Sequence, residues 1–275
     1  MNFVSATTYE VFDAAGVDII KVKDQLNPYW MNPKVNPIFK DAVVREALCH
    51  MIDWNEVNEI AYNGLYRVAD SIFDGPGSYP YGDNYKYDPE LGLKMLADAG
   101  YKPEDIKFEM LADPDFTVDE TVITQMFNDL GLVNVSFVTL DGATCYGMLK
   151  GGTYEVFPCH DGYGVLNPLT PYTMGLTDTG RPELGIQPAV FIHDMNEEAF
   201  NEVMEYYDKA LISPTFDEYI ENVSNITRIV QENNCALGGL TKTRFYAINP
   251  RISGVFPSQE GGNIEFCYLY DNTLG

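Results

Sequence analysis

The 275-residue sequence lacks the features that mark several large classes of protein. It has no run of about 18 apolar residues, so no segment is predicted to cross a membrane as a helix. Its start, MNFVSATTYE, has neither the basic nor the apolar region of a secretory signal peptide. Basic residues are scarce, with 17 Lys and Arg against 41 Asp and Glu and a net charge of −24. Because binding to a phosphate backbone depends on neutralisation by Lys and Arg, we expect no nucleic-acid partner.

Common signatures of enzymes and metal sites are also missing. The chain has no Gly-x-Ser-x-Gly, no His-Glu-x-x-His, no P-loop and no Gly-x-Gly-x-x-Gly. Its five cysteines are widely spread without a Cys-x-x-Cys pair, and only three histidines are present. We expect the cysteines to be mostly buried free thiols, and no metal or cofactor is predicted.

The residues that are present predict a folded α/β protein. The chain is 45% hydrophobic and 13% aromatic, and at this length it can bury about 70% of its unfolded surface. Apolar residues recur at helical spacing in several segments, and aspartates suited to cap helices precede four of them. The predicted helices begin at Asp41, Asp53 (ending at Gly64), Asp88 (ending at Gly100), Val118 (ending at Gly131), Asp141, Glu197 and Phe216.

Alternating apolar residues predict strands on either side of one of these helices. Ile106 to Met110 precedes the helix that starts near Val118, and Val133 to Phe137 follows it. Strand, helix and strand in this order are typical of a parallel sheet. Further strands are predicted in TYEVF, from Phe245 to Ile248 and in IEFCYLY, whereas residues 1–36 are predicted as strand and connector.

One segment concentrates reactive side chains. Cys159, His160 and Asp161 are consecutive in FPCHDGYGVLNP, in a loop directly after the strand-like TYEVF. Successive side chains of an extended segment point in different directions, so these three cannot easily converge on one ion. A Cys-His nucleophile pair likewise usually comes from residues that are distant in sequence. A metal site would need further ligands from elsewhere, for which the candidates are Cys145, His50 and His193.

Two longer motifs carry more information than this cluster. PIFKDAVVREALCHMIDWNEV, from Pro37 to Val57, and YKYDPELGLKMLADAGY, from Tyr85 to Tyr101, stand on either side of Gly64. Their order and separation resemble the signatures of the family 5 solute-binding proteins of ABC importers, which include peptide and nickel binders. The similarity continues through the predicted strand, helix and strand, and it ends with a short element near Gly254 or Val255 and a final strand.

The resemblance implies an α/β lobe of a type II periplasmic-binding-protein-like fold, with a mixed sheet flanked by helices. The chain is similar to about the second half of a family member, which implies that the signal peptide, the lipid-anchor cysteine and most of the first lobe are absent. Residues 1–34 would be a remnant of the first lobe with a connector, 35–240 the ligand-binding C-terminal lobe, and 241–275 a return to the first lobe. Hinge segments are expected near Asn27 to Asn32 and near Leu240 to Ala247.

In peptide binders of this family, an aspartate in the loop after the strand receives the amino terminus of the ligand, and Asp161 is the nearest match. A carboxylate in that position pairs well with an ammonium group. His160, Tyr163 and Asn167 of the same loop are the other candidate ligand contacts, although the Gly-Trp and Asp-Pro that family members often carry there are replaced.

The resemblance therefore implies the substrate-binding component of an ABC transporter that imports oligopeptides or similar small solutes. Such a protein binds and delivers without catalysis, and its full-length form would be a periplasmic or cell-surface lipoprotein that docks on a membrane permease. The alternative from another class is a metal-dependent hydrolase that uses His160, Asp161 and a distant third ligand. A third possibility is a binding module that acts without transport.

Overall fold

The computed structural model describes residues 2–4, 6–73, 75–112, 114, 116–158, 169, 191–257, 264–265 and 270–271. The cluster from Cys159 to Asp161, together with Tyr163 and Asn167, lies outside the described residues. In the described part, no helix combines the length and the hydropathy needed to cross a bilayer.

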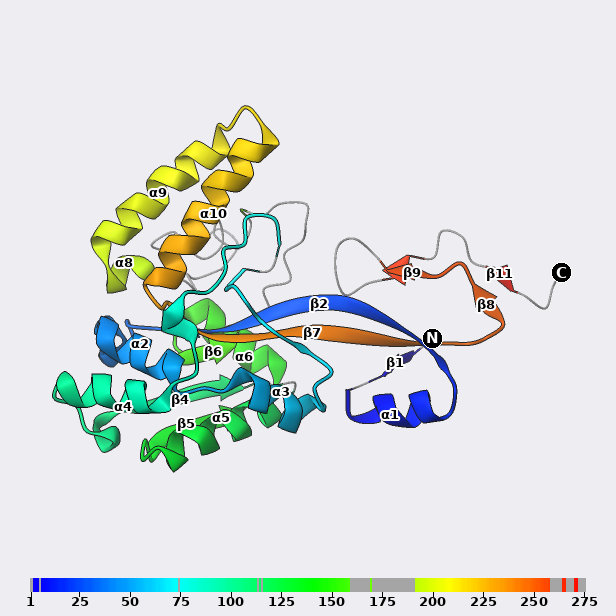
Figure 1. The fold of residues 1–275 in the computed structure, drawn as a ribbon, viewed down its shortest axis with the longest axis horizontal. Helices are drawn as coiled ribbons and strands as arrows, with labels where there is room; N and C mark the ends of the chain where they lie inside the picture. The colour runs from blue at the N-terminus through cyan, green and yellow to red at the C-terminus, as the bar shows by residue number, and fades with distance from the viewer. Residues whose placement is uncertain are drawn as a thin grey trace.

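Helices and strands alternate through the middle of the chain (Figure 1). The helices are α1 (Ala6–Ala14), α2 (Ala42–His50), α3 (Trp54–Tyr62), α4 (Pro89–Asp98), α5 (Thr117–Asp129), α6 (Gly142–Gly151), α8 (Ile192–Met195), α9 (Glu197–Leu211) and α10 (Phe216–Glu232). The strands are β1 (Asn2–Val4), β2 (Asp18–Met31), β3 (Arg67–Val68), β4 (Lys107–Ala112), β5 (Asn134–Thr139), β6 (Val156–Pro158), β7 (Ala236–Ile248), β8 (Ile252–Ser253), β9 (Phe256–Pro257), β10 (Ile264–Glu265) and β11 (Tyr270–Asp271). Short 3-10 helices cover Pro37–Lys40, Asp83–Tyr85 and Pro103–Asp105.

One mixed sheet forms the centre of the molecule. Its strand order is β1-β7-β2-β6-β4-β5, and β3 also pairs with β7. Strand β4 runs parallel to β5 and β6, whereas β2 is antiparallel to both β6 and β7. The predicted parallel strand-helix-strand unit is confirmed, and so is the α/β class with helices flanking a mixed sheet.

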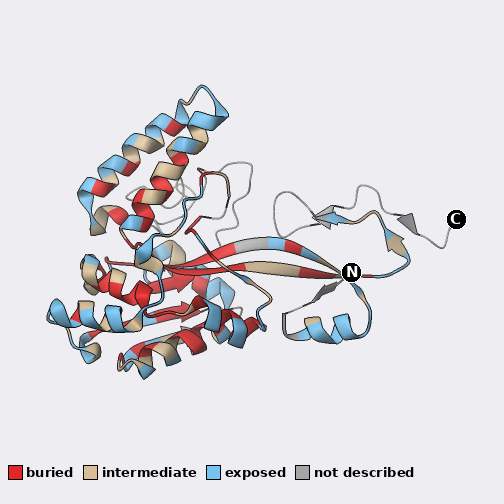
Figure 2. Ribbon diagram, in the orientation of Figure 1, coloured by how far each residue is buried: buried red, intermediate tan, exposed pale blue. Residues whose placement is uncertain are grey.

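Two apolar clusters cover opposite sides of the sheet near the C-terminal end of β2. Adjacent side chains of a strand point to opposite faces. Tyr29 accordingly joins the main cluster under α2 to α5, and Trp30 joins the cluster under α8 to α10. Figure 2 shows the buried residues concentrated in this compact body, while β2 and β7 extend together from it towards the N-terminus.

All four predicted aspartate caps are confirmed. Each accepts a hydrogen bond from a backbone N–H group in the first turn of the helix that follows, as helix capping requires. The aspartates are Asp41, Asp53, Asp88 and Asp141. The expected helix end at Gly64 is shifted slightly, because α3 ends at Tyr62 and Asn63 already has the left-handed conformation.

The first 36 residues differ from the prediction. They contain helix α1 in addition to strands, and Tyr9 of this helix packs on Phe245 of β7 with ring centroids 4.9 Å apart. Strand β2 also continues through Asn27 and Pro28, where a Pro-rich connector was expected. Strand β7 likewise begins at Ala236, nine residues before the predicted start at Phe245. The two long strands support each other, because β2 pairs with β7 from Asp18 to Trp30.

Candidate functional site

The ends of the three parallel strands define the place where a ligand is expected. Strands β4, β5 and β6 end at Ala112, Thr139 and Pro158, and we call this side of the sheet the carboxyl-end edge. Open α/β sheets bind ligands outside the carboxyl ends of their strands. The segment that carries Asp161 follows β6 directly, and Pro158 is paired with Tyr29 of β2. Pro158, the last residue before this segment, therefore lies beside β2, and its partner Tyr29 is two residues after Asn27.

The predicted ligand contacts themselves lie outside the described residues, so their roles stay predictions. The three side chains considered as additional metal ligands each have another contact in the fold. His50 is buried with its Nδ1 2.6 Å from the carbonyl oxygen of Lys86, and the thiol of Cys145 lies 3.4 Å from the carbonyl oxygen of Ala112. His193 lies beside its neighbour Asp194. Within the described ranges, no three His, Cys, Asp or Glu residues are grouped as a metal site requires.

Three of the five cysteines fall in the described part of the chain. Cys49, Cys145 and Cys235 are buried free thiols, as predicted for them. Burial raises the pKa of both Cys49 and Cys235 to about 12. The positive charge of Arg45 lowers both pKa values, and a hydrogen bond with Asn234 also lowers that of Cys49, but these effects are smaller than that of burial. At neutral pH both remain protonated and are poor nucleophiles.

A buried polar cluster at the carboxyl-end edge escaped sequence reasoning. The hydroxyl of Tyr62, at the end of α3, donates a hydrogen bond to the carboxylate of Asp119 in the first turn of α5. Lys242 of β7 lies with its Nζ 4.0 Å from the ring centroid of Phe116, directly before α5. The cluster therefore connects two helices to the long strand β7 at the carboxyl-end edge.

The buried face of α5 is not the one that its apolar residues alone would indicate. Val118, at which the helix was predicted to begin, is exposed, whereas Asp119 and Glu120 are buried, as are Ile123 and Phe127. A pattern based on apolar residues alone could not identify two carboxylates as inward-facing. The signal that could have identified them is their position one turn before Ile123 and two turns before Phe127, on the same side of the helix.

The environment of Asp119 predicts an unusual dependence of stability on pH. Burial raises the pKa of this carboxyl from its ordinary 3.8 to about 6, against the opposing effects of Tyr62 and Lys242. Between these values the folded chain binds more protons than the unfolded chain, so this contribution to the free energy of unfolding falls as pH rises. Relative to wild type, Asp119→Asn is expected to gain about 2 kcal/mol between pH 4 and pH 7.5.

Urea unfolding of both proteins at the two pH values measures this difference. Asp129→Asn, at the exposed end of the same helix, is the control and should show no comparable gain. An Asp119→Asn variant whose stability follows that of wild type in parallel from pH 4 to pH 7.5 would contradict the assignment.

Asn27 is the second feature that sequence reasoning missed. It is only 2% exposed, and within the described part of the chain neither atom of its side-chain amide has a hydrogen-bond partner. Irregularities in the β2–β7 pairing occur on both sides of it, between Lys23 and Leu26 and between Pro28 and Trp30. Buried amides without partners are rare because each lost hydrogen bond costs about 1–3 kcal/mol. Such a group, close to where the Asp161 segment begins, is well placed to bind a polar ligand atom.

Chemically, the carboxyl-end edge offers hydrogen bonding and charge pairing. Its described polar groups are a carboxyl, a phenol, an ammonium and an amide, supplied by Asp119, Tyr62, Lys242 and Asn27. The arrangement suits recognition of a polar solute.

Comparisons with known proteins agree with this fold. The chain superposes on the crystal structure of NikA from Brucella suis in complex with Fe(III)-EDTA with a TM-score of 0.74 and 16% identity, over 94% of this chain and 53% of that one. The oligopeptide-binding protein AppA from Bacillus subtilis, in complex with a nonapeptide, gives a TM-score of 0.73 and 16% identity, over 94% and 54% of the two chains. The type II periplasmic-binding-protein-like fold is thereby confirmed, and the chain spans about half the length of these neighbours.

Sequence comparison points the same way. A protein of Brucella ovis, named as an ABC transporter peptide-binding protein, is 27% identical over 133 residues, which are 44% of this chain and 24% of that protein. The hydrolase alternative gains no support from these relatives. The family model described as "Bacterial extracellular solute-binding proteins, family 5 Middle" matches residues 2–183, well over half of the chain. The chain therefore belongs to family 5 of the bacterial extracellular solute-binding proteins.

Proposed function

We propose that the chain forms the ligand-binding C-terminal lobe of an extracytoplasmic protein that captures oligopeptides or similar small solutes and delivers them to an ABC permease. The family match over residues 2–183 carries this proposal. The chain binds and does not catalyse, and the complete polypeptide is a periplasmic protein or a cell-surface lipoprotein. Metal analysis of the purified chain separates this function from that of a hydrolase, because stoichiometric zinc would favour the enzyme.

The proposed domain division rests on the apolar clusters along the β2–β7 pair, which differ between its two ends. Residues 35–240 make up the lobe, and 1–34 and 241–275 belong to the hinge and to the other lobe. In support, Val22, Tyr246 and Ile248 form a small apolar cluster separate from the main cores. The pairing irregularities around Asn27 give the strands a point at which to bend. Ligand-driven closure about such a hinge is a population shift that a permease can detect.

Asp161 is proposed to pair with the ammonium group of a peptide ligand, and His160, Tyr163 and Asn167 to contact the rest of it. Asn27 is proposed as an additional contact, because its unpaired amide can donate to a peptide carbonyl and accept from a peptide N–H. The test is to compare peptides that have a free amino terminus with the same peptides after acetylation. Only the free peptides are expected to bind measurably.

The role of Asn27 makes a separate prediction about stability. Asn27→Leu is expected to leave the free energy of unfolding unchanged or to raise it by about 1 kcal/mol, because an unpaired amide is replaced by an apolar group of similar size. The same variant should weaken peptide binding. Denaturant unfolding and a peptide titration measure the two effects.

Asn32 provides the matched control. Its Nδ2 donates to the carbonyl oxygens of Gly152 and Tyr154 at 3.1 and 2.8 Å, and its Oδ1 accepts from the backbone N–H of Lys34 at 3.0 Å. Asn32→Leu should therefore lower the free energy of unfolding by about 2–4 kcal/mol, because it leaves these groups unpaired. Equal losses in both variants would refute the ligand-binding interpretation of Asn27.

A further inference from the structure

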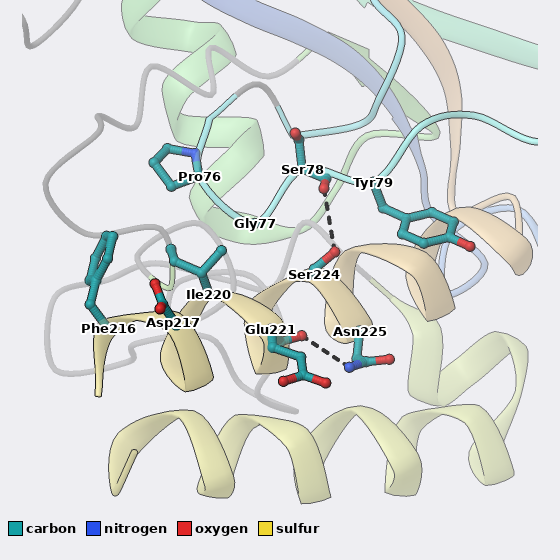
Figure 3. Close-up of a pocket in the computed structure, with 10 residues that line it drawn as sticks. All are labelled: Pro76, Gly77, Ser78, Tyr79, Phe216, Asp217, Ile220, Glu221, Ser224 and Asn225. Atoms are coloured by element: carbon teal, nitrogen blue, oxygen red, sulfur yellow. Dashed lines mark hydrogen bonds between the residues drawn. The ribbon is translucent and has the colours of Figure 1, made fainter. Parts of the chain in front are cut away.

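A groove with a volume of about 500 Å³ lies between the first half of α10 and the segment formed by residues 76–79 (Figure 3). Phe216, Asp217, Ile220 and Glu221 line it from the helix. Pro76 and Tyr79 lie on the facing segment. This volume falls within the range of about 300–1,000 Å³ that is typical of ligand pockets. Neither the predicted ligand contacts nor the carboxyl-end edge includes any of these residues.

The segment that forms one wall is fixed to the helix. The hydroxyl of Thr227 donates to the carbonyl oxygen of Gly77 at 2.9 Å, and the side-chain amide of Gln231 donates to that of Pro80 at 3.3 Å. Gly77 has a φ of +88°, and an added Cβ would lie 2.7 Å from a methyl carbon of Val223. Only glycine permits this close contact. The groove is therefore largely pre-formed.

The lining of the groove combines apolar surface with negative charge. Asp217 and Glu221 are among its lining residues, and none of the described residues that line it is Lys or Arg. Helices α9 and α10 together carry nine acidic and two basic residues. Both basic residues are already paired, Lys209 with Glu205 and Arg228 with Glu202 and Glu232. The groove is thus complementary to a cation that carries apolar groups.

An anion does not fit this site, although α10 begins here. The N-terminus of a helix attracts anions through its free N–H groups. In α10, however, the hydroxyl of Thr215 accepts from the backbone N–H of Glu218, and Asp217 and Glu218 already place two negative charges in the first turn. A phosphate or carboxylate would be repelled by these charges.

Apolar surface continues from the groove onto the turn between α9 and α10. Leu211, Ile212 and Phe216 are 61%, 81% and 63% exposed, and we call these three residues the apolar tip. Exposed apolar residues that gather beside a pocket are typical of protein interaction sites and of ligand-binding grooves. A small solute held in the groove would leave the tip uncovered. A polypeptide segment could cover both.

We propose that the groove and the apolar tip together bind a segment of a partner protein that presents one or two Lys or Arg side chains among apolar or aromatic ones. The basic side chains pair with Asp217 and Glu221, and the apolar ones pack on Phe216 and the rest of the tip. Aromatic and aliphatic anchors with a charged rim are typical of such contacts. This proposal is independent of the solute-binding function, because it uses none of the same residues.

The probe is a synthetic peptide, acetyl-Gly-Leu-Arg-Trp-Lys-Leu-Gly-amide, titrated into the full chain by calorimetry. Both ends are blocked, so a site that recognises a free amino terminus cannot bind it. Binding is expected in the range of about 10–100 μM. Hydrogen exchange of the complex should show protection at residues 76–79 and 216–225. A peptide with Ser in place of Leu and Trp should bind at least about tenfold more weakly, which corresponds to a loss of about 1.4 kcal/mol.

Because the whole chain is strongly acidic, a matched charge control is essential. The double variant Asp217→Asn/Glu221→Gln should weaken the peptide at least about tenfold. Glu197→Gln/Glu198→Gln removes the same charge from the other end of the α9–α10 pair and should change binding by less than about twofold. Equal weakening by both pairs, protection elsewhere in the chain, or no binding up to about 1 mM would overturn the proposal.

Discussion

Replacing Arg45 by methionine is expected to lower the free energy of unfolding by about 3 kcal/mol or more. The guanidinium is buried, and it donates from Nε to the carbonyl oxygen of Asn233 at 3.0 Å and from Nη1 to those of Phe39 and Lys40 at 2.9 and 3.1 Å. Methionine fills a similar volume but leaves all three carbonyls without these donors. Urea unfolding at pH 7 measures the loss.

Two further substitutions test whether the hydrogen bonds to these carbonyl oxygens cause the loss of stability. Arg45→Lys keeps the charge but loses the planar fork that reaches several carbonyls at once, so it should also cost about 2 kcal/mol or more. Arg228→Met removes an arginine of α10 whose ion pairs with Glu202 and Glu232 are partly exposed, and it should cost less than about 1 kcal/mol. Similar losses for Arg45→Met and Arg228→Met would show that the carbonyl contacts are unimportant.

Replacing Gly239 by alanine is expected to cost about 3 kcal/mol or more, because it forces β2 and β7 apart. The added Cβ would lie 2.1 Å from the carbonyl oxygen of Asn27 and 2.8 Å from the carbonyl carbon. Both contacts are with backbone, which cannot move aside as a flexible side chain can. Gly239 faces Pro28 in the pairing, at the proposed hinge. The variant should therefore also increase hydrogen exchange along β2 and β7.

Gly147→Ala is the matched control for this substitution. Gly147 lies inside α6, and an added Cβ would meet nothing within 4 Å. Alanine there should raise stability by about 0.5–1 kcal/mol, because glycine loses more freedom when it enters a helix. Thermal unfolding of both variants gives the comparison. Wild-type stability of Gly239→Ala would mean that the strands are not in close contact at this point.

Local signals explain why much of the fold could be predicted from the sequence. Each helix that begins with an aspartate cap was found, because the cap, the apolar face and the stop all lie within about 15 residues. Helix α1 was missed because it has no acidic residue in its first turn and no basic residue in its last.

The long strands and the polar cluster depend on distant partners and could not be predicted in the same way. Pro28 and Gly239 are local signals against a strand, yet each lies in one because β2 and β7 pair across more than 200 residues of sequence. Likewise, Lys242 and Asp119 come together only in the folded chain. For Asn27, the informative property is that no described residue is its hydrogen-bond partner, which no sequence pattern can reveal.

The most direct test of the central claim, that this lobe recognises peptides by charge pairing and hydrogen bonding, is a titration of the chain by NMR. Tripeptides with a free amino terminus are compared with their acetylated forms, in wild type and in Asp161→Asn. The free peptides are expected to bind with a dissociation constant on the order of 1 mM, because one lobe supplies only part of the contacts. Acetylation or Asp161→Asn should abolish binding. Equal binding of acetylated peptides, binding that Asp161→Asn leaves unchanged, or hydrolysis of the peptides would contradict the claim.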